Sequence, residues 1–162
     1  MDIKLVPITN DNVWDVYKMS VAKHQEDFVA PNDQSLIEAY VTVLKGGYVH
    51  TFAINQGDTP VGFVMLGYGA QEGDPEIAKN NYLIWRFMID HEHQGKGYGK
   101  QALHEAIKFI KSFPNGEAKS CWLSYEPENT FAKKFYASFG FEETGEICDD
   151  ELVAVLSLNS YK

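Results

Sequence analysis

Three glycines at alternate positions give one segment of this chain a clear chemical signature. The segment reads Gln94-Gly95-Lys96-Gly97-Tyr98-Gly99 and separates an apolar stretch, Tyr82 to Asp90, from an amphipathic stretch that runs to Phe113. Glycines allow a sharp turn and a close approach of the backbone to a ligand. The first N–H groups of a helix are unpaired, and the helix dipole makes its N-terminus positive. The pattern therefore predicts that backbone donors here bind a phosphate or pyrophosphate.

Two common phosphate-binding loops do not fit this segment. A P-loop requires a lysine followed by Ser or Thr, whereas here Gly99 is followed by Lys100 and Gln101. A dinucleotide fingerprint requires Gly-x-Gly-x-x-Gly in an early βαβ unit, whereas these glycines are spaced two and two. A third pattern, Gln/Arg-x-x-Gly-x-Gly/Ala between a strand and a helix, is satisfied by Gln94, Gly97 and Gly99.

Other residues with reactive side chains lack the partners that their chemistry requires. His91 and His93 have a spacing found in metal sites, but no third ligand is evident, so no metal is expected. Cys121 as a nucleophile would need an adjacent base, and none is indicated. A thiol in the core of a predicted strand is the expected role of Cys121.

The elements that must position the glycine segment follow from hydrophobic patterning. The predicted order is β-α-α-β-β-β-α-β-α-β-β, with no repeat or linker, which implies one domain over residues 1–162 built on a mixed sheet with helices on both faces. The second helix is predicted to begin at Ser35 to Glu38, which has capping-box spacing, and to carry an apolar face. The residues of that face are Leu36, Ile37, Tyr40, Val41 and Leu44.

Two later helices also carry apolar stripes. The helix after the glycine segment is predicted to bury Ala102, Leu103, Ala106, Ile107, Phe109, Ile110 and Phe113. A short helix capped by Asn129 has the stripe Phe131, Ala132, Phe135, Tyr136 and Phe139. On periodicity alone, Tyr136 belongs to that stripe as a packing residue.

Composition limits the classes of partner. The 162 residues include 14 basic and 23 acidic side chains, and the net charge of −9 argues against nucleic-acid binding while suiting a small cationic substrate. No apolar run reaches the ~20 residues that a membrane helix needs, and no secretory signal is visible. Two isolated cysteines, Cys121 and Cys148, suggest the cytoplasm. Unpaired terminal strands suggest a homodimer.

Two blocks of sequence, in the expected order, resemble the GNAT superfamily of N-acetyltransferases. The first is Gln94 to Gly99, and the second runs from Asn129 through Phe135-Tyr136 to Gly140-Phe141. The resemblance covers the full chain and implies an acyl-CoA N-acyltransferase fold, a mixed, mostly antiparallel twisted sheet of about seven strands in an α/β (α+β) arrangement. It also implies that acetyl-CoA is the co-substrate and that no metal takes part.

The resemblance further implies roles for single residues. The backbone of Phe87, Met88 and Ile89 is expected to bind the pantetheine arm and to polarise the thioester carbonyl, where this strand splays from the Cys121–Tyr125 strand. The pyrophosphate is assigned to Gln94, Gly95, Lys96, Gly97, Tyr98, Gly99 and Lys100. Asn129 is expected to be both a helix cap and a cofactor contact. Tyr136, a phenol protonated at neutral pH, is the expected general acid for the leaving thiolate.

The likeness is greatest to the spermine/spermidine acetyltransferases, through Arg-Phe-Met-Ile-Asp (86–90) before Gln-Gly-Lys-Gly (94–97). In those relatives a carboxylate often precedes this stretch, where the chain has Trp85 and Arg86. Glu126, Glu26 or water are therefore the candidate bases. Glu26 and Asp27 are expected to bind a substrate ammonium, and Trp85 and Glu126 to contact the substrate.

The implied activity is direct acetyl transfer, in a ternary complex, to a primary amine of a small cationic substrate such as spermidine or spermine. A protein, peptide or aminoglycoside-like amine is an alternative acceptor. A non-catalytic acyl-CoA sensor on the same scaffold is the alternative of a different class.

Overall fold

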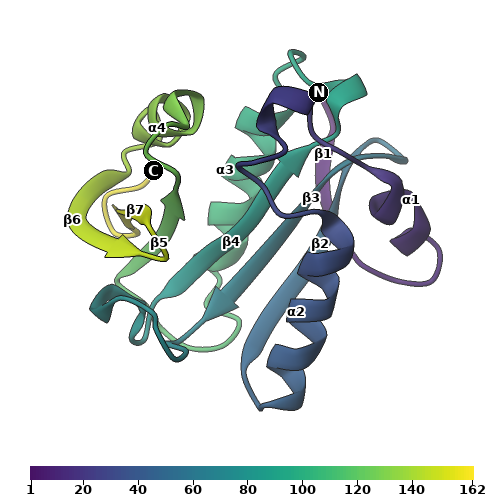
Figure 1. The fold of residues 1–162 in the computed structure, drawn as a ribbon. Helices are drawn as coiled ribbons and strands as arrows, with labels where there is room; N and C mark the ends of the chain where they lie inside the picture. The colour runs from purple at the N-terminus through teal and green to yellow at the C-terminus, as the bar shows by residue number, and fades with distance from the viewer.

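The computed structural model describes all 162 residues, and its elements follow the predicted order (Figure 1). The strands are β1 (Ile3–Pro7), β2 (Tyr48–Gln56), β3 (Thr59–Tyr68), β4 (Tyr82–Ile89), β5 (Ser120–Tyr125), β6 (Glu142–Cys148) and β7 (Glu151–Ser157). The helices are α1 (Val13–Lys18), α2 (Asn32–Leu44), α3 (Tyr98–Ile110) and α4 (Thr130–Ala137), with 3₁₀ turns at Lys23–Gln25, Glu76–Ala78 and His91–His93. None of the helices has the length and apolar character needed to cross a bilayer.

One seven-stranded sheet, in the order β1-β2-β3-β4-β5-β7-β6, forms the centre of the molecule. Every neighbouring pair is antiparallel except β4 and β5, which are parallel. The predicted fold class, a mixed and mostly antiparallel sheet of about seven strands, is therefore confirmed. Figure 1 shows α2 in front of this sheet and α3 behind it.

The single parallel pair is also the point where the sheet opens. β4 and β5 pair only through Tyr82 with Cys121 and Leu83 with Trp122, after which the two strands diverge. On its other side, β4 stays paired with β3 as far as Ile89, with an irregularity in register beside Trp85. The edge of β4 that faces β5 therefore has no strand partner beyond Leu83.

The larger core lies between the sheet and α3, as the apolar stripe of α3 predicts. Five predicted residues are buried there: Ala102, Leu103, Ala106, Ile107 and Ile110. Phe109 is half-buried. Phe113 is 37% exposed and has φ 53°, because the helix has ended at Ile110 before Pro114. A smaller cluster on the opposite face contains Val16, Ala39, Ala53, Phe63, Met65 and Met88.

The prediction for α2 was wrong in its start and in which face it buries. The helix begins at Asn32, with Pro31 as its N-cap, and the Ser35 hydroxyl donates to the Pro31 carbonyl oxygen (3.2 Å). The buried residues are Asn32, Ser35, Ala39 and Thr42, whereas Ile37, Tyr40, Val41 and Leu44 are exposed. Asn32 explains the inversion, because its side-chain amide donates to the Val16 carbonyl oxygen (2.9 Å) and holds this narrow polar face inward.

The outer strands of the sheet are β1 and β6. β6 carries Glu142, Glu143 and Glu146, and its register against β7 shifts between Glu143 and Ile147. Charges and irregular register discourage edge-to-edge pairing of strands. The homodimer expected through the terminal strands stays a prediction.

Candidate active site

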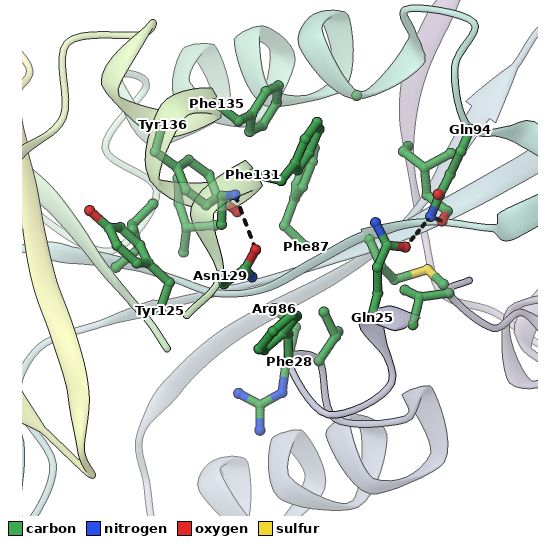
Figure 2. Close-up of a pocket in the computed structure, with 18 of the residues that line it drawn as sticks. Gln25, Phe28, Arg86, Phe87, Gln94, Tyr125, Asn129, Phe131, Phe135 and Tyr136 are labelled. Carbon is green, nitrogen blue, oxygen red and sulfur yellow. Dashed lines mark hydrogen bonds between the residues drawn. The ribbon is translucent and has the colours of Figure 1, made fainter. Parts of the chain in front are cut away.

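A cleft of about 1000 Å³ occupies the opening between β4 and β5. Its walls come from these two strands, the loop before α3, the start of α4 and residues 21–31 (Figure 2). Figure 2 shows Phe87 and Arg86 pointing to opposite sides of β4. The cleft is therefore lined by side chains from both faces of the sheet.

Most of the glycine segment lines this cleft. Gly95 and Gly97 have φ of 75° and 82°, in the left-handed region that other residues avoid. Gly97 is the N-cap of α3, and no side chain caps this helix. The first N–H groups, from Gly97 to Lys100, thus remain available to a ligand, and the helix dipole favours an anion there. This geometry fits the pyrophosphate of acetyl-CoA.

Gln94 fixes the loop through its side chain. The amide nitrogen of Gln94 donates to the side-chain oxygen of Gln25 (2.8 Å) and to the Ile89 carbonyl oxygen (3.0 Å). The same Gln25 oxygen accepts the backbone N–H of Ala22 (3.2 Å). The Gln94 side chain therefore joins the end of β4 to the 3₁₀ turn at Lys23–Gln25, and its amide donors are already occupied.

The two predicted lysines are placed differently. Lys100 lines the cleft at the start of α3, whereas Lys96 is not among the lining residues. The Lys96 ammonium donates to the Glu92 carbonyl oxygen (3.1 Å), and the side chain is exposed. Of the two, only Lys100 is positioned at the cleft to meet an anionic ligand.

The backbone of β4 forms the floor of the cleft. Phe87, Met88 and Ile89 all line it, and this stretch lies beyond the last pair with β5. Unpaired backbone N–H and C=O groups require partners when they are buried. An amide-bearing chain such as the pantetheine arm provides both kinds of partner.

Aromatic side chains cover the α4 side of the cleft. Phe87 and Phe131 each stack on Phe135, with ring centroids 6.2 and 5.9 Å apart. Tyr136 packs edge-on against Phe135 (5.2 Å) and stacks on Tyr125 (6.3 Å). The predicted stripe of α4 therefore faces the cleft as well as the core, with Phe131 69% exposed.

Tyr136 combines packing with a free hydroxyl. The side chain is half-buried and lines the cleft, and its hydroxyl has no hydrogen-bond partner in the protein. Burial raises the pKa of Tyr136 above its ordinary value. By contrast, the neighbouring Tyr125 hydroxyl donates to Glu143 (2.8 Å). The Tyr136 hydroxyl is thus protonated at neutral pH, and it donates no hydrogen bond to another residue of the chain.

Asn129 caps α4, as predicted. Its side-chain oxygen accepts the backbone N–H of Ala132 (3.1 Å), which Figure 2 marks with a dashed line. Asn129 also lines the cleft. The cap therefore fixes the start of the helix that carries Phe135 and Tyr136.

Asn129→Ala is expected to lower the free energy of unfolding by about 1 kcal/mol, because one N–H group of α4 loses its acceptor. Asn129→Asp keeps that acceptor and is the matched control. Urea titration of both variants measures the difference. An unchanged midpoint for Asn129→Ala would contradict the capping role.

The predicted substrate residues do not all reach the cleft. Glu26, Asp27 and Trp85 line it, whereas Glu126 is half-buried and is not among the lining residues. Arg86 lines the cleft too, and its guanidinium pairs with Glu38 of α2 (3.0 Å). A carboxylate thus stands near this part of β4, but it comes from α2 and is neutralised by Arg86.

Several residues that line the cleft were missed from the sequence. Among them are Gln25, Phe28, Ser124, Tyr125, Glu128, Phe131 and Glu151. The acidic ones, Glu128 and Glu151, join Glu26 and Asp27, so the lining includes four carboxylates and two permanently charged cations, Arg86 and Lys100. For Gln25 and Phe28, the acidic and aromatic character of residues 24–31 was the only available signal.

The surroundings of His91 and Cys121 fit a structural role for each side chain. The ring of His91 lies 3.4 Å from the Ser20 hydroxyl and 3.5 Å from the Asp90 carboxylate. No group of three His, Cys, Asp or Glu side chains is arranged to hold a metal ion. Cys121 is fully buried, and burial raises its pKa to about 12.

Comparison with known proteins agrees with this geometry. Residues 13–141 match the model of the acetyltransferase (GNAT) family. The chain is 29% identical, over 147 residues, to spermine/spermidine N(1)-acetyltransferase of Bacillus subtilis (strain 168), a match that covers 91% of this chain and 92% of the relative.

Two solved structures share the fold. One is PaiA N-acetyltransferase from Thermoplasma acidophilum in complex with coenzyme A (TM-score 0.67, 17% identity, covering 97% of this chain and 99% of that chain). The other is aminoglycoside acetyltransferase AAC(6')-Ib in complex with coenzyme A (TM-score 0.77, 17% identity, covering 96% and 95%). The family match spans most of the chain and includes both the glycine loop and Tyr136. The chain therefore belongs to the acetyltransferase (GNAT) family, and acetyl-CoA is its acyl donor.

Proposed function

We propose that this protein transfers the acetyl group of acetyl-CoA directly to a primary amine of a small polycationic substrate, with polyamines such as spermidine and spermine as the favoured class. One observation carries the proposal. A single cleft is lined both by the start of α3, with its unpaired N–H groups, and by four carboxylates, Glu26, Asp27, Glu128 and Glu151. The lining of one cavity therefore offers donors that suit an anionic acyl donor and carboxylates that suit a cationic acceptor.

Different residues of the cleft serve different parts of the acetyl transfer. Acetyl-CoA supplies an activated acetyl group and a thiolate leaving group. The N–H groups from Gly97 to Lys100 hold the diphosphate, and the open edge of β4 at Phe87–Ile89 aligns the pantetheine arm. Tyr136 supplies a proton at the sulfur. Because the Tyr136 hydroxyl has no acceptor within the protein, it is free to donate its proton to the thiolate.

The acidic residues support a cationic acceptor. Glu26 and Asp27 are exposed at the cleft and attract ammonium groups to it, and the net charge of −9 adds a long-range field of the same sign. The 29% identity to a curated spermine/spermidine acetyltransferase favours polyamines over other amines. The two unpaired cysteines are consistent with a reducing compartment, and we place the protein in the cytoplasm.

A panel of amines tests this function by thiol release from acetyl-CoA. Spermidine and spermine are expected to give saturable turnover, and kanamycin and a peptide with a free N-terminus little or none. Efficient turnover only with kanamycin or only with the peptide would replace polyamines by that acceptor class. Binding of coenzyme A without turnover on any amine would show a sensor instead of an enzyme.

A further inference from the structure

One carboxylate of the cleft differs from the others in how firmly it is held. Glu26, Asp27 and Glu128 are exposed, whereas Glu151 is half-buried. The Ser124 hydroxyl on β5 donates to the Glu151 carboxylate at 2.7 Å. Exposed carboxylates attract a cation from a distance, but a fixed and partly desolvated one can contact a bound ammonium in a single geometry.

The backbone fixes this carboxylate as well. Asp149 and Asp150 both have positive φ (48° and 63°), so they form the two-residue turn that joins β6 to β7 with matching twist. The turn pairs Cys148 with Glu151, and β7 then pairs with β5 along its length. Glu151 is therefore the first residue of a strand that is anchored on both sides.

Glu151 enters the cleft from the face opposite to Tyr136. Along β7, the alternate residues Leu152 and Ala154 pack into the core on the α3 side together with Tyr125 and Tyr136. Glu151 has the opposite parity, like Val153, which belongs to a different cluster. The chain thus places a proton acceptor and a proton donor on two sides of one cavity.

We propose that Glu151, positioned by Ser124, is the catalytic base that receives the proton of the bound substrate ammonium. This inference rests on the proposed amine acetylation. The lone pair freed on nitrogen forms the N–C bond to the acetyl carbonyl carbon, and the C–S bond breaks with its pair going to sulfur. Tyr136 protonates that sulfur, the second nitrogen proton restores the phenol through solvent, and Glu151 returns its proton to water.

The charged surroundings of Glu151 suit this role. Burial raises the pKa of Glu151, and the charges of Glu126 and Asp149 act in the same direction. The Ser124 hydrogen bond and Arg86 lower this pKa, but the net shift is upward. Burial raises the pKa of the paired Cys148 thiol, and the charges of Asp149, Asp74 and Glu151 raise it further. A carboxylate with a raised pKa is a stronger base than an ordinary one. It acts only when ionised, so activity should fall as the pH drops through this pKa.

Glu151→Gln is expected to lower kcat/KM for spermidine by about 100-fold, while the Kd for coenzyme A and the unfolding midpoint stay unchanged. Ser124→Ala is expected to move the acidic limb of the kcat/KM profile to higher pH, because the hydrogen bond that lowers the pKa of Glu151 is lost. A purely structural role for Ser124 would not move that limb. Glu126→Gln removes the same charge nearby but outside the cleft, and its plateau rate should stay within about twofold.

The possible results distinguish an error in the proposed function from an error in the assignment of Glu151 alone. If the wild-type protein binds coenzyme A but turns over no amine, the proposed function is wrong. If the wild-type protein acetylates spermidine and Glu151→Gln does so at the same rate, only the assignment of Glu151 is overturned. If both glutamine variants lose activity equally, charge near the cleft matters and a specific base at Glu151 is excluded.

Discussion

Tyr136→Phe is expected to lower kcat by about 100-fold or more, the usual contribution of a positioned acid. The substitution removes only the hydroxyl, which has no partner in the protein, so the packing of the ring against Tyr125, Phe135 and Phe141 stays intact. The free energy of unfolding should hardly change. Steady-state thiol release at saturating spermidine and acetyl-CoA measures kcat.

The stacked neighbour gives a matched control. Tyr125→Phe also removes one phenol hydroxyl, but that hydroxyl donates to Glu143, which in turn pairs with Lys133 (3.1 Å). This variant should lose roughly 1 kcal/mol of stability and keep most of its turnover. Equal kcat values for Tyr136→Phe and the wild-type protein would remove Tyr136 from the mechanism.

Sequence patterns predicted the fold well wherever one physical requirement acts on a local stretch. The Tyr82–Asp90 segment is apolar because β4 is covered on both faces, and Asn129 precedes α4 because the first turn of that helix needs an acceptor. The prediction of the buried face of α2 was wrong because the orientation of this helix depends on a contact between Asn32 and Val16, which are sixteen residues apart. Periodicity measures where apolar residues lie on a helix, and a buried polar anchor can outweigh it.

The clearest sequence signals for the site come from chemistry that is local in sequence. The glycines, Tyr136 and Asn129 lie in two short blocks, and the structure brings both to one cleft. Glu151 was missed because its place there depends on the pairing of β7 with β5, which connects distant segments. Glu126 was one of the candidate bases because it follows β5 directly, yet it is not among the residues that line the cleft. Adjacency in sequence does not show where a side chain points.

Gly97→Ala is expected to raise the Kd for coenzyme A by tenfold or more. The residue has φ 82°, and an alanine there costs about 1–2 kcal/mol unless the backbone rotates. Rotation at the N-cap would turn the N–H groups at the start of α3 away from the diphosphate. An added Cβ has only the Met1 side chain nearby, at 3.7 Å, so the effect comes from the backbone and not from a clash.

Gly46→Ala separates loss of binding from loss of stability. Gly46 follows the end of α2 with φ 81°, and a Cβ there would meet nothing within 4 Å. Both alanine variants therefore place a Cβ at nearly the same positive φ and should lose similar free energy of unfolding, measured in urea. Calorimetric titration with coenzyme A should then show weaker binding for Gly97→Ala alone. Equal affinities in the two variants would mean that the start of α3 does not bind the diphosphate, because the backbone strain is shared and only the position differs.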